Sequence, residues 1–326
     1  MVISNIHNRT MITDVVLLNP YHIGDVLFNQ KIVYYFCKSN PSYKIRVCIH
    51  RGHFLLSDIP GIEYDTNTTL MRGFTRGKRS LFRRGTLFLN MWIFAINRTT
   101  SEIECNYQRV YEGFRTMLTE INARYCTQFQ MPDVSTINPI YTLPYTNIDP
   151  FLTWKEHHTD KQLVLYMNYM PQSGQPIPIT SHDDVIKRLS SAHRDTIFLI
   201  ANLSDTLKHY VSENSITNLV DCVSEFDCTE TESCENICKI NHIMRACDYA
   251  VVFDIGACFT YADDKLFDYP HTVLHVATAS FFYNCISESF NKDIFNTKVR
   301  LTLATDQEGV IRTLSDIFAT KKIHSI

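Results

Sequence analysis

One stretch near the amino terminus limits the fold of this chain more than any other. Val15-Val16-Leu17-Leu18 is a short apolar run typical of a buried strand. Asn19-Pro20 ends the run, and Gly24 allows a tight turn. After Asp25 the apolar residues recur at helical spacing until Asn40-Pro41, which stops a helix. The residues on the inward face of that helix are Val26, Leu27, Ile32, Val33 and Phe36. The stretch therefore predicts a strand, a tight loop and a helix with a carboxylate at its mouth.

Strand and helix patterns continue to alternate along the chain in two blocks. In the first block we expect strands at 43–49, 62–64 and 87–95, and an amphipathic helix at 102–125 that turns Val110, Phe114, Met117, Leu118 and Ile121 inward. In the second block we expect strands at 162–167, 196–201, 217–221 and 250–253, with helices at 183–189, from 205, at 236–246 and at 307–319.

A proline-rich stretch separates the two blocks, with Pro132, Pro139, Pro144 and Pro150 at short intervals. We place the linker near its end, which divides the chain into domains of residues 1–152 and 153–326. Strand–helix alternation predicts an α/β protein with mainly parallel sheets. A ligand site is expected in the cleft between two such domains.

The composition argues against several classes of protein. The 326 residues are 45% hydrophobic, which fits a chain with a substantial core, and the formal net charge of −3 makes no case for nucleic acid or a membrane surface. The 11 cysteines are scattered and odd in number, no stretch has the layout of a signal peptide, and no apolar run is long enough to span a bilayer. We expect a cytoplasmic protein with free thiols.

Asp25 allows two interpretations. As a capping carboxylate it would accept backbone N–H bonds at the start of the helix, a common structural role. As a general base it would remove a proton from a ligand, because it follows a strand end in a tight loop, where ligands bind in open α/β sheets.

A basic stretch follows the third expected strand. Residues 71–86 are rich in arginine and lysine and are interrupted by three glycines, so we expect a loop. Its charges either form a solvated surface or contact phosphate groups of an acceptor, because guanidinium groups match phosphate oxygens. The arginines proposed for the second role are Arg72, Arg76 and Arg79.

The strands of the second block are followed by polar loops. Each loop has an ordinary interpretation as a strand-to-helix turn and a functional one as a contact for a diphosphate, a ribose or a sugar. Ser204 in particular is as well explained as a helix cap. The candidate residues are Gln172, Ser173, Gly174, Ser204, Asp205, Asp254, Ile255 and Gly256.

Motifs for other chemistries are missing from the sequence. It contains no phosphate-binding P-loop, no Gly-x-Gly-x-x-Gly, no Gly-x-Ser-x-Gly and no kinase motif set. Cys234, Cys238 and His242 share one predicted helix face, but the spacing does not match paired zinc ligands. We predict no metal site and no cofactor.

Two motifs in order resemble the lipopolysaccharide heptosyltransferase family. The first runs from Asn19 to Leu27 and is followed by a helix, Asn40-Pro41 and the strand Ile45-Arg46-Val47. The second runs from Ile240 to Gly256 and contains a helix, an Ala-Cys-Asp turn and a strand ending in Asp254-Ile255-Gly256. The family consists of glycosyltransferases of the GT-B type, which have two Rossmann-like domains.

The resemblance implies an inverting, metal-independent glycosyltransferase. Asp25 would be its general base, and His22, Gly24 and the three arginines would lie on the acceptor side. The remaining candidates, together with His275, would hold a nucleotide-sugar donor. The acceptor would be a glycan or glycolipid, including a phosphorylated one.

The sequence departs from the family pattern at two positions. The usual histidine after the second signature is replaced in its neighbourhood by Phe259-Thr260, and His275-Val276-Ala277 matches it only if residues 263–270 are an insertion. The lysine of the phosphate loop has no match near 172–175. Two alternatives therefore stay open: an epimerase of GT-B fold that acts on a nucleotide-sugar, and a glycan- or nucleotide-binding module without catalysis.

Overall fold

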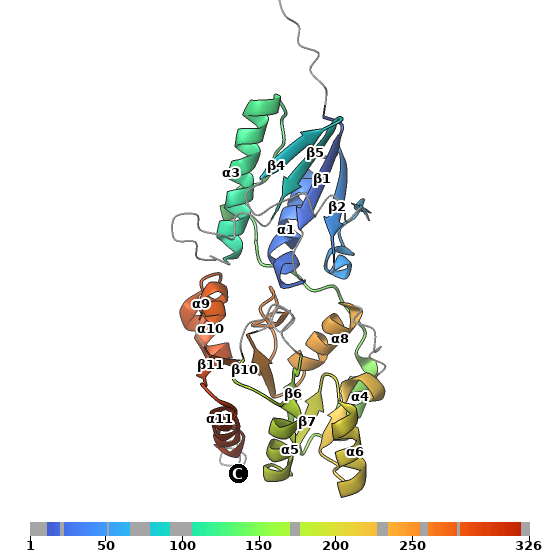
Figure 1. Ribbon diagram of the computed structural model, residues 1–326, viewed down its shortest axis with the longest axis vertical. Coiled ribbons are helices and arrows are strands. Elements are labelled where there is room, and N and C mark those ends of the chain that lie inside the picture. The colour runs from blue at the N-terminus through green and yellow to red at the C-terminus, as the bar shows by residue number, and fades with distance from the viewer. Residues whose placement is uncertain are drawn as a thin grey trace, which may run out of the picture. The chain divides into compact units, whose positions relative to one another are not determined.

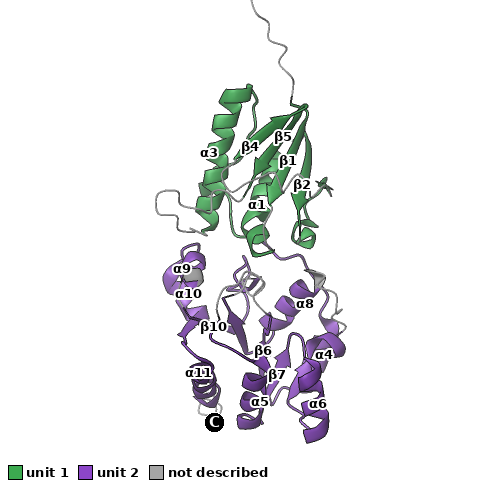
Figure 2. Ribbon diagram, viewed as in Figure 1, with its two compact units in different colours: residues 1–141 green, residues 142–326 purple. Residues whose placement is uncertain are grey.

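The computed structural model describes residues 12–19, 23–50, 52–65, 79–91, 106–169, 177–226, 234–254, 260–278 and 281–320. The chain forms two compact units, residues 1–141 and 142–326 (Figure 2). Each unit contains a mainly parallel sheet with helices, so the predicted α/β class is confirmed. The division falls before the position 152/153 expected from the prolines. Residues from 142 on pack with the second unit, where Phe151 lies edge-on to Phe226 at 5.2 Å.

The described part of the first unit contains the predicted strands and helices in the predicted order, together with one strand and two 3₁₀ turns that were not predicted. They are β1 (Asp14–Asn19), α1 (Ile23–Ser39), β2 (Lys44–Ile49), the 3₁₀ turn η1 (His53–Leu56), β3 (Glu63–Tyr64), β4 (Ser80–Arg83), β5 (Thr86–Asn90), α3 (Tyr107–Tyr125) and η3 (Val134–Thr136). The five strands form one sheet in the order β3-β2-β1-β5-β4. Strands β1, β2, β4 and β5 are labelled in Figure 1. All neighbours are parallel except β4 and β5.

Strand β1 is the centre of the first sheet because both of its faces are apolar. Val15, Val16, Leu17 and Leu18 are fully buried, as expected for a parallel strand covered on both sides. Val16 and Leu18 share one face and cluster with Cys48 of β2 and Phe88 of β5.

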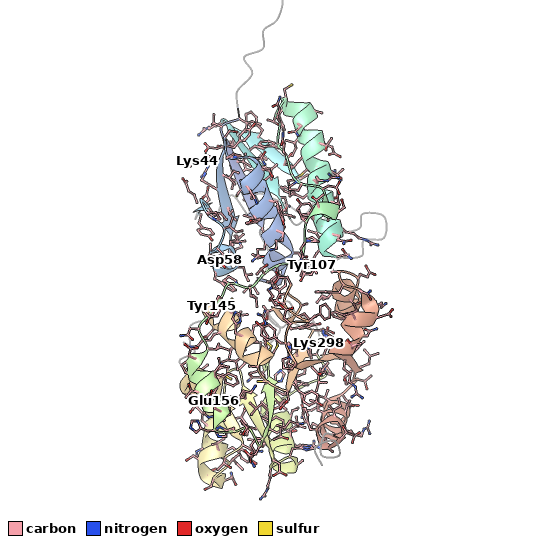
Figure 3. The ribbon with its side chains drawn as sticks, turned by 180° about the vertical axis from the view of Figure 1, so that it is seen from behind. Lys44, Asp58, Tyr107, Tyr145, Glu156 and Lys298 are labelled. Carbon is pink, nitrogen blue, oxygen red and sulfur yellow. The ribbon has the colours of Figure 1, made fainter. Side chains whose placement is uncertain are left out.

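Helices α1 and α3 pack together through aromatic side chains at helical spacing. Phe28 stacks on Tyr107 with ring centroids 4.4 Å apart, and Phe36 meets Phe114 edge-on at 5.9 Å. Tyr107 is labelled in Figure 3. Every residue predicted to face inward on these two helices is buried. The side chain of Asn106 caps α3 by accepting from the backbone N–H groups of Gln108 and Arg109.

The prediction of a loop over residues 71–86 is wrong at its carboxyl end. Residues 80–83 form β4, an edge strand antiparallel to β5. Arg84 and Gly85 form the two-residue turn between them, with φ of 50° and 82°, as tight hairpins require. Basic residues and a glycine thus belong to a hairpin whose outer strand carries charge, which is common for an exposed edge. Residues 66–78 lie outside the described part of the chain.

The second unit contains the other elements. They are α4 (Asp149–Glu156), β6 (Gln162–Tyr166), α5 (His182–Ala192), β7 (Thr196–Ile200), α6 (Asp205–Asn214), β8 (Leu219–Asp221), α7 (Cys222–Glu225), α8 (Cys234–Arg245), β9 (Tyr249–Phe253), β10 (Thr272–Ala277), α9 (Phe281–Ser287), α10 (Lys292–Lys298), β11 (Val299–Leu303) and α11 (Gln307–Thr320). The strands expected at 162–167, 196–201, 217–221 and 250–253 are confirmed within a few residues. Strands β10 and β11 were not predicted.

The second sheet is parallel throughout, in the order β11-β10-β9-β6-β7-β8. If its strands are numbered along the chain, the order from β8 is 3-2-1-4-5-6, the arrangement of dinucleotide-binding folds. The direction of winding reverses between β6 and β9. In such sheets the carboxyl ends of the strands at this switch point form the ligand-binding edge.

Candidate functional site

Asp25 lies at the switch point of the first sheet. The winding reverses beside β1, which has β2 on one side and β5 on the other, and α1 starts shortly after β1 ends. Asp25 is half-buried in the first turn of α1, as predicted, and its backbone carbonyl accepts from Asn29 Nδ2 at 2.5 Å. The helix begins at Ile23, so Gly24 is a buried helical residue and not part of a loop. His22 lies outside the described residues.

Of the three arginines expected on the acceptor side, the structure describes Arg79. Its Nη1 donates to both carboxylate oxygens of Glu120 on α3, at 3.2 and 3.1 Å. Both side chains are substantially exposed, so the pair is solvated and contributes little to stability. Arg72 and Arg76 lie outside the described residues.

In the second unit, three side chains line the base of the switch point. Tyr166 ends β6, Phe253 ends β9 and His182 begins α5. His182 Nδ1 is 3.0 Å from the Tyr166 hydroxyl, and the His182 ring packs edge-on to Phe253 at 5.0 Å. Burial lowers the pKa of His182 to about 4, although Asp183 opposes the shift, so the ring is neutral at pH 7.

The start of α5 carries negative charge. Asp183 and Asp184 occupy its first turn. Asp183 accepts from the Ser204 hydroxyl at 2.7 Å, and Asp184 accepts from Gln307 Nε2 at 2.6 Å. Two carboxylates at a helix amino terminus disfavour a further anion there, although such a terminus otherwise attracts phosphate. Gln172, Ser173 and Gly174, which precede this helix, lie outside the described residues.

Asp254 and His275, both predicted as donor contacts, are brought together by the register of two strands. Asp254 directly follows β9, and His275 lies within the neighbouring strand β10. His275 Nε2 is 2.6 Å from Asp254 Oδ1, and His275 Nδ1 is 2.8 Å from the Tyr261 hydroxyl. His275 is fully buried with both nitrogens engaged, so an effect of its ring on a ligand is transmitted through its hydrogen-bond partners, among them Asp254. Ile255 and Gly256 lie outside the described residues.

Ser204 and Asp205 lie at the carboxyl end of β7. Ser204 caps α6, because its hydroxyl oxygen accepts from the Leu207 backbone N–H at 3.1 Å while the hydroxyl donates to Asp183. The capping role expected for this serine is therefore confirmed. The side chain of Asp205 is fully exposed in the first turn of α6, 4.0 Å from Lys208 Nζ. Whether either residue contacts a donor stays a prediction.

The connection from β9 to β10 is held by a buried ion pair. Arg245 ends α8 and pairs with Asp263; their side chains are 3% and 0% exposed. Burial raises the pKa of Asp263, against the opposing effect of Arg245. Asp264 next to it accepts from the Thr142 hydroxyl at 2.7 Å. Residues 260–271 of this connection contain no α-helix, so the part of it that is described supplies no helix amino terminus for a phosphate.

Two residues of this edge were missed by the sequence analysis. Tyr261 follows the departure at Phe259-Thr260 and lies in the connection between β9 and β10, and nothing in its sequence neighbourhood indicates its bond to His275. His182 had a weak signal. It follows Ser181, the cap of α5, in a helix that comes after a buried strand.

The two units thus define an α/β protein whose second sheet has the topology of nucleotide-binding folds and carries a buried carboxylate at its switch point. No protein-family model and no curated protein matches the sequence. Among solved structures, a glycosyl transferase of family 9 from Veillonella parvula aligns with a TM-score of 0.45 and 11% identity over 94% of this chain and 90% of its own.

Two further solved structures align at the same level. E. coli heptosyltransferase WaaC with ADP-2-deoxy-2-fluoro heptose has a TM-score of 0.45 and 10% identity, over 94% of this chain and 99% of its own. A proposed UDP-N-acetylglucosamine 2-epimerase from Listeria monocytogenes has a TM-score of 0.44 and 12% identity, over 95% and 89%. Similarity this distant does not assign an activity or a substrate to the chain.

None of the helices in the described part of the chain combines the length and the apolar character needed to cross a bilayer.

Proposed function

We propose that this chain is a glycosyltransferase that moves a sugar from a nucleotide-sugar to a hydroxyl group of a glycan-type acceptor. The observation that carries the proposal is the six-stranded parallel sheet of the second unit, whose winding reverses between β6 and β9 with Asp254 at that edge. Sheets of this order bind nucleotides at the switch point. The buried carboxylate is suited to accept hydrogen bonds from sugar hydroxyl groups.

The first unit supplies the general base in this proposal. Asp25 follows the central strand β1 at a second switch point and is half-buried in the first turn of α1. It takes the proton of the acceptor hydroxyl, whose oxygen then attacks the anomeric carbon. The bond to the nucleoside diphosphate breaks, the leaving group takes the electron pair, and the configuration at the anomeric carbon inverts.

The reaction so proposed needs no metal ion. Backbone N–H groups of loops at the switch point and basic side chains stabilise the charge that develops on the leaving diphosphate. His22, Gly24, Arg72, Arg76 and Arg79 are assigned to the acceptor, which includes phosphorylated glycans and glycolipids. The reaction takes place in the cytoplasm, where nucleotide-sugars and free thiols coexist.

The experiment begins with the donor. The purified chain is screened by thermal shift against UDP-, GDP-, ADP- and CMP-sugars, each beside its free nucleotide, and stabilisation by one nucleotide class is expected. The stabilising donor is then incubated with and without glycan acceptors in the presence of EDTA. Transfer that requires an acceptor and persists in EDTA supports the proposal. Isomerisation of the donor without an acceptor identifies an epimerase instead.

Two structural observations favour a second candidate, a nucleotide- or glycan-binding module without catalysis. Two features at the edge of the second sheet are unfavourable for a diphosphate: the acidic first turn of α5 and the absence of an α-helix within residues 260–271. Stabilisation by a nucleotide-sugar without turnover under any acceptor condition would favour this candidate. Stabilisation by a glycan alone would favour it as well.

A further inference from the structure

The hydrogen-bonded chain from Tyr261 through His275 to Asp254 extends the proposed donor site inward. Its three residues are 1%, 0% and 6% exposed. The two heavy-atom distances, 2.8 and 2.6 Å, are those of strong hydrogen bonds. The Tyr261 ring also lies edge-on to the imidazole, with centroids 5.8 Å apart. Tyr261 and Asp254 therefore hold the imidazole of His275 by hydrogen bonds at both nitrogens, and the Tyr261 ring also packs against it.

The chemistry of the three groups sets the direction of the protons. An ionised carboxylate only accepts, so His275 Nε2–H donates to Asp254 Oδ1. In a neutral imidazole Nδ1 is then an acceptor, and it receives the Tyr261 hydroxyl proton. One tautomer satisfies both bonds. Removal of the Tyr261 hydroxyl releases the second bond and with it the preference for that ring orientation.

The other carboxylate oxygen of Asp254 is available to a ligand. Among the described residues, Asp254 Oδ2 makes no side-chain hydrogen bond, and the carboxylate lies at the carboxyl end of β9. A carboxylate that has one oxygen held by a hydrogen bond presents its other oxygen in a fixed direction. Such an arrangement favours the hydroxyl groups of a sugar, which donate hydrogen bonds, over a phosphate group, which carries negative charge.

We propose that Tyr261 and His275 are positioning residues that hold the Asp254 carboxylate for the sugar part of a nucleotide-sugar. This inference rests on the proposed function. It adds that Tyr261 and His275, which touch neither ligand, help the protein to discriminate between the nucleotide-sugar and the free nucleotide. The pair acts through Asp254 alone.

The test uses Tyr261→Phe, which removes one hydroxyl group and keeps the ring. Tyr283→Phe is the matched control, because the Tyr283 ring also lies edge-on to His275, at 6.1 Å, while its hydroxyl donates to Asn296. Calorimetric titration with the stabilising nucleotide-sugar and with its free nucleotide is compared across wild type and both variants. We expect Tyr261→Phe to weaken binding of the nucleotide-sugar about fivefold, the effect of one hydrogen bond, and to leave the free nucleotide unchanged. Tyr283→Phe is expected to change neither affinity.

A second measurement tests the hydrogen bonds among Tyr261, His275 and Asp254 in the protein without a ligand. Long-range ¹H–¹⁵N spectra of the labelled protein, with His275 assigned by comparison with His275→Gln, should show a protonated Nε2 and a bare Nδ1 at pH 7.5. The opposite tautomer, or a doubly protonated ring, overturns the proposal. The spectrum of Tyr261→Phe should show a displaced Nδ1 resonance, because that nitrogen loses its hydrogen bond to the hydroxyl.

The outcomes separate this proposal from the one on which it rests. If wild type binds a nucleotide-sugar and Tyr261→Phe binds it equally well, the positioning role is overturned and the proposed function stands. If Tyr261→Phe weakens the nucleotide-sugar and the free nucleotide alike and lowers the melting temperature, the pair serves stability and the positioning role is again overturned. If wild type binds no nucleotide-sugar, both proposals fail.

Discussion

Arg245 at the end of α8 and Asp263 in the β9–β10 connection form an ion pair that is almost completely removed from solvent. The guanidinium group also lies over the ring of Tyr269, 5.1 Å from its centroid. The connection that leads from Asp254 to the strand of His275 is therefore anchored by a charge pair. Its contribution is measurable because each partner is buried, and buried charges without partners are strongly destabilising.

We predict that Arg245→Met and Asp263→Leu each lower the free energy of unfolding by about 3–5 kcal/mol, because each leaves one uncompensated buried charge. The double variant should lose clearly less than the sum of the two. Urea unfolding followed by circular dichroism at pH 8, where the carboxylate of wild type is ionised, measures all three. Additive losses would show that the two charges do not interact.

Asp25→Asn should reduce the rate of sugar transfer at least about a hundredfold, because an amide cannot accept the proton of the acceptor hydroxyl. Nucleotide affinity and melting temperature should stay close to those of wild type. The control is Asp14→Asn, which makes the same change at the amino end of β1, the opposite end of the strand that precedes Asp25. Full activity of Asp25→Asn would remove this residue from the mechanism.

His271 should make the protein less stable in acid. It is 1% exposed, neither ring nitrogen has a hydrogen-bond partner among the described residues, and burial lowers its pKa to about 3, with Lys298 and Arg245 adding to the shift. The unfolded chain takes up a proton below the ordinary pKa of 6.5, whereas the folded protein does not. This contribution to stability is present above pH 6.5 and is lost as the pH falls toward 3.

His271→Leu should therefore remove part of the acid sensitivity. Between pH 6.5 and 5 a histidine of this kind accounts for about 2 kcal/mol of lost stability. Urea unfolding of wild type and variant at pH 7.5 and 5 gives the difference. The comparison cancels other groups, including Asp263, whose raised pKa acts in the opposite direction over the same range. Equal pH dependence in both proteins would contradict the prediction.

Asn40 should stabilise the first unit through both ends of its amide. Nδ2 donates to the carbonyl groups of Phe36 and Gln130 at 2.8 Å each, and Oδ1 accepts from the Gln130 N–H at 2.9 Å. Asn40→Asp replaces the donor by an oxygen that faces two carbonyl oxygens, so we expect a loss of about 2–4 kcal/mol. Asn138→Asp is the control, because exposed Asn138 uses only its acceptor, toward the Ile140 N–H. Thermal unfolding of both variants decides the prediction, and equal melting temperatures would refute it.

The sequence predicted those parts of the fold that local pattern determines. The β1–α1 stretch, the inward face of α3 and the parallel strands from β6 to β9 follow from hydrophobic periodicity and stop signals. Strand β4 was missed because arginine and glycine at the hairpin resemble a loop. Strand β10 was missed because His275 interrupts an otherwise apolar run.

The candidate site could be predicted only residue by residue. Asp254 and His275 were both identified as donor residues, but their bond depends on the parallel register of β9 and β10, which residues far apart in sequence determine. Tyr261 enters the site through the fold of the β9–β10 connection, which no local sequence pattern determines. Ser204 could be predicted as a helix cap from the local sequence, and the structure confirms this role.

The strand order of the second sheet also sets the order in which this unit can be completed during synthesis. Strand β6 acquires its first neighbour, β7, after 30 further residues or so, but its other edge stays open until β9 at 249–253 has left the ribosome. During that interval the future middle of the sheet is an apolar edge able to pair with other chains. The yield of folded protein should therefore depend on how quickly residues 167–253 are translated.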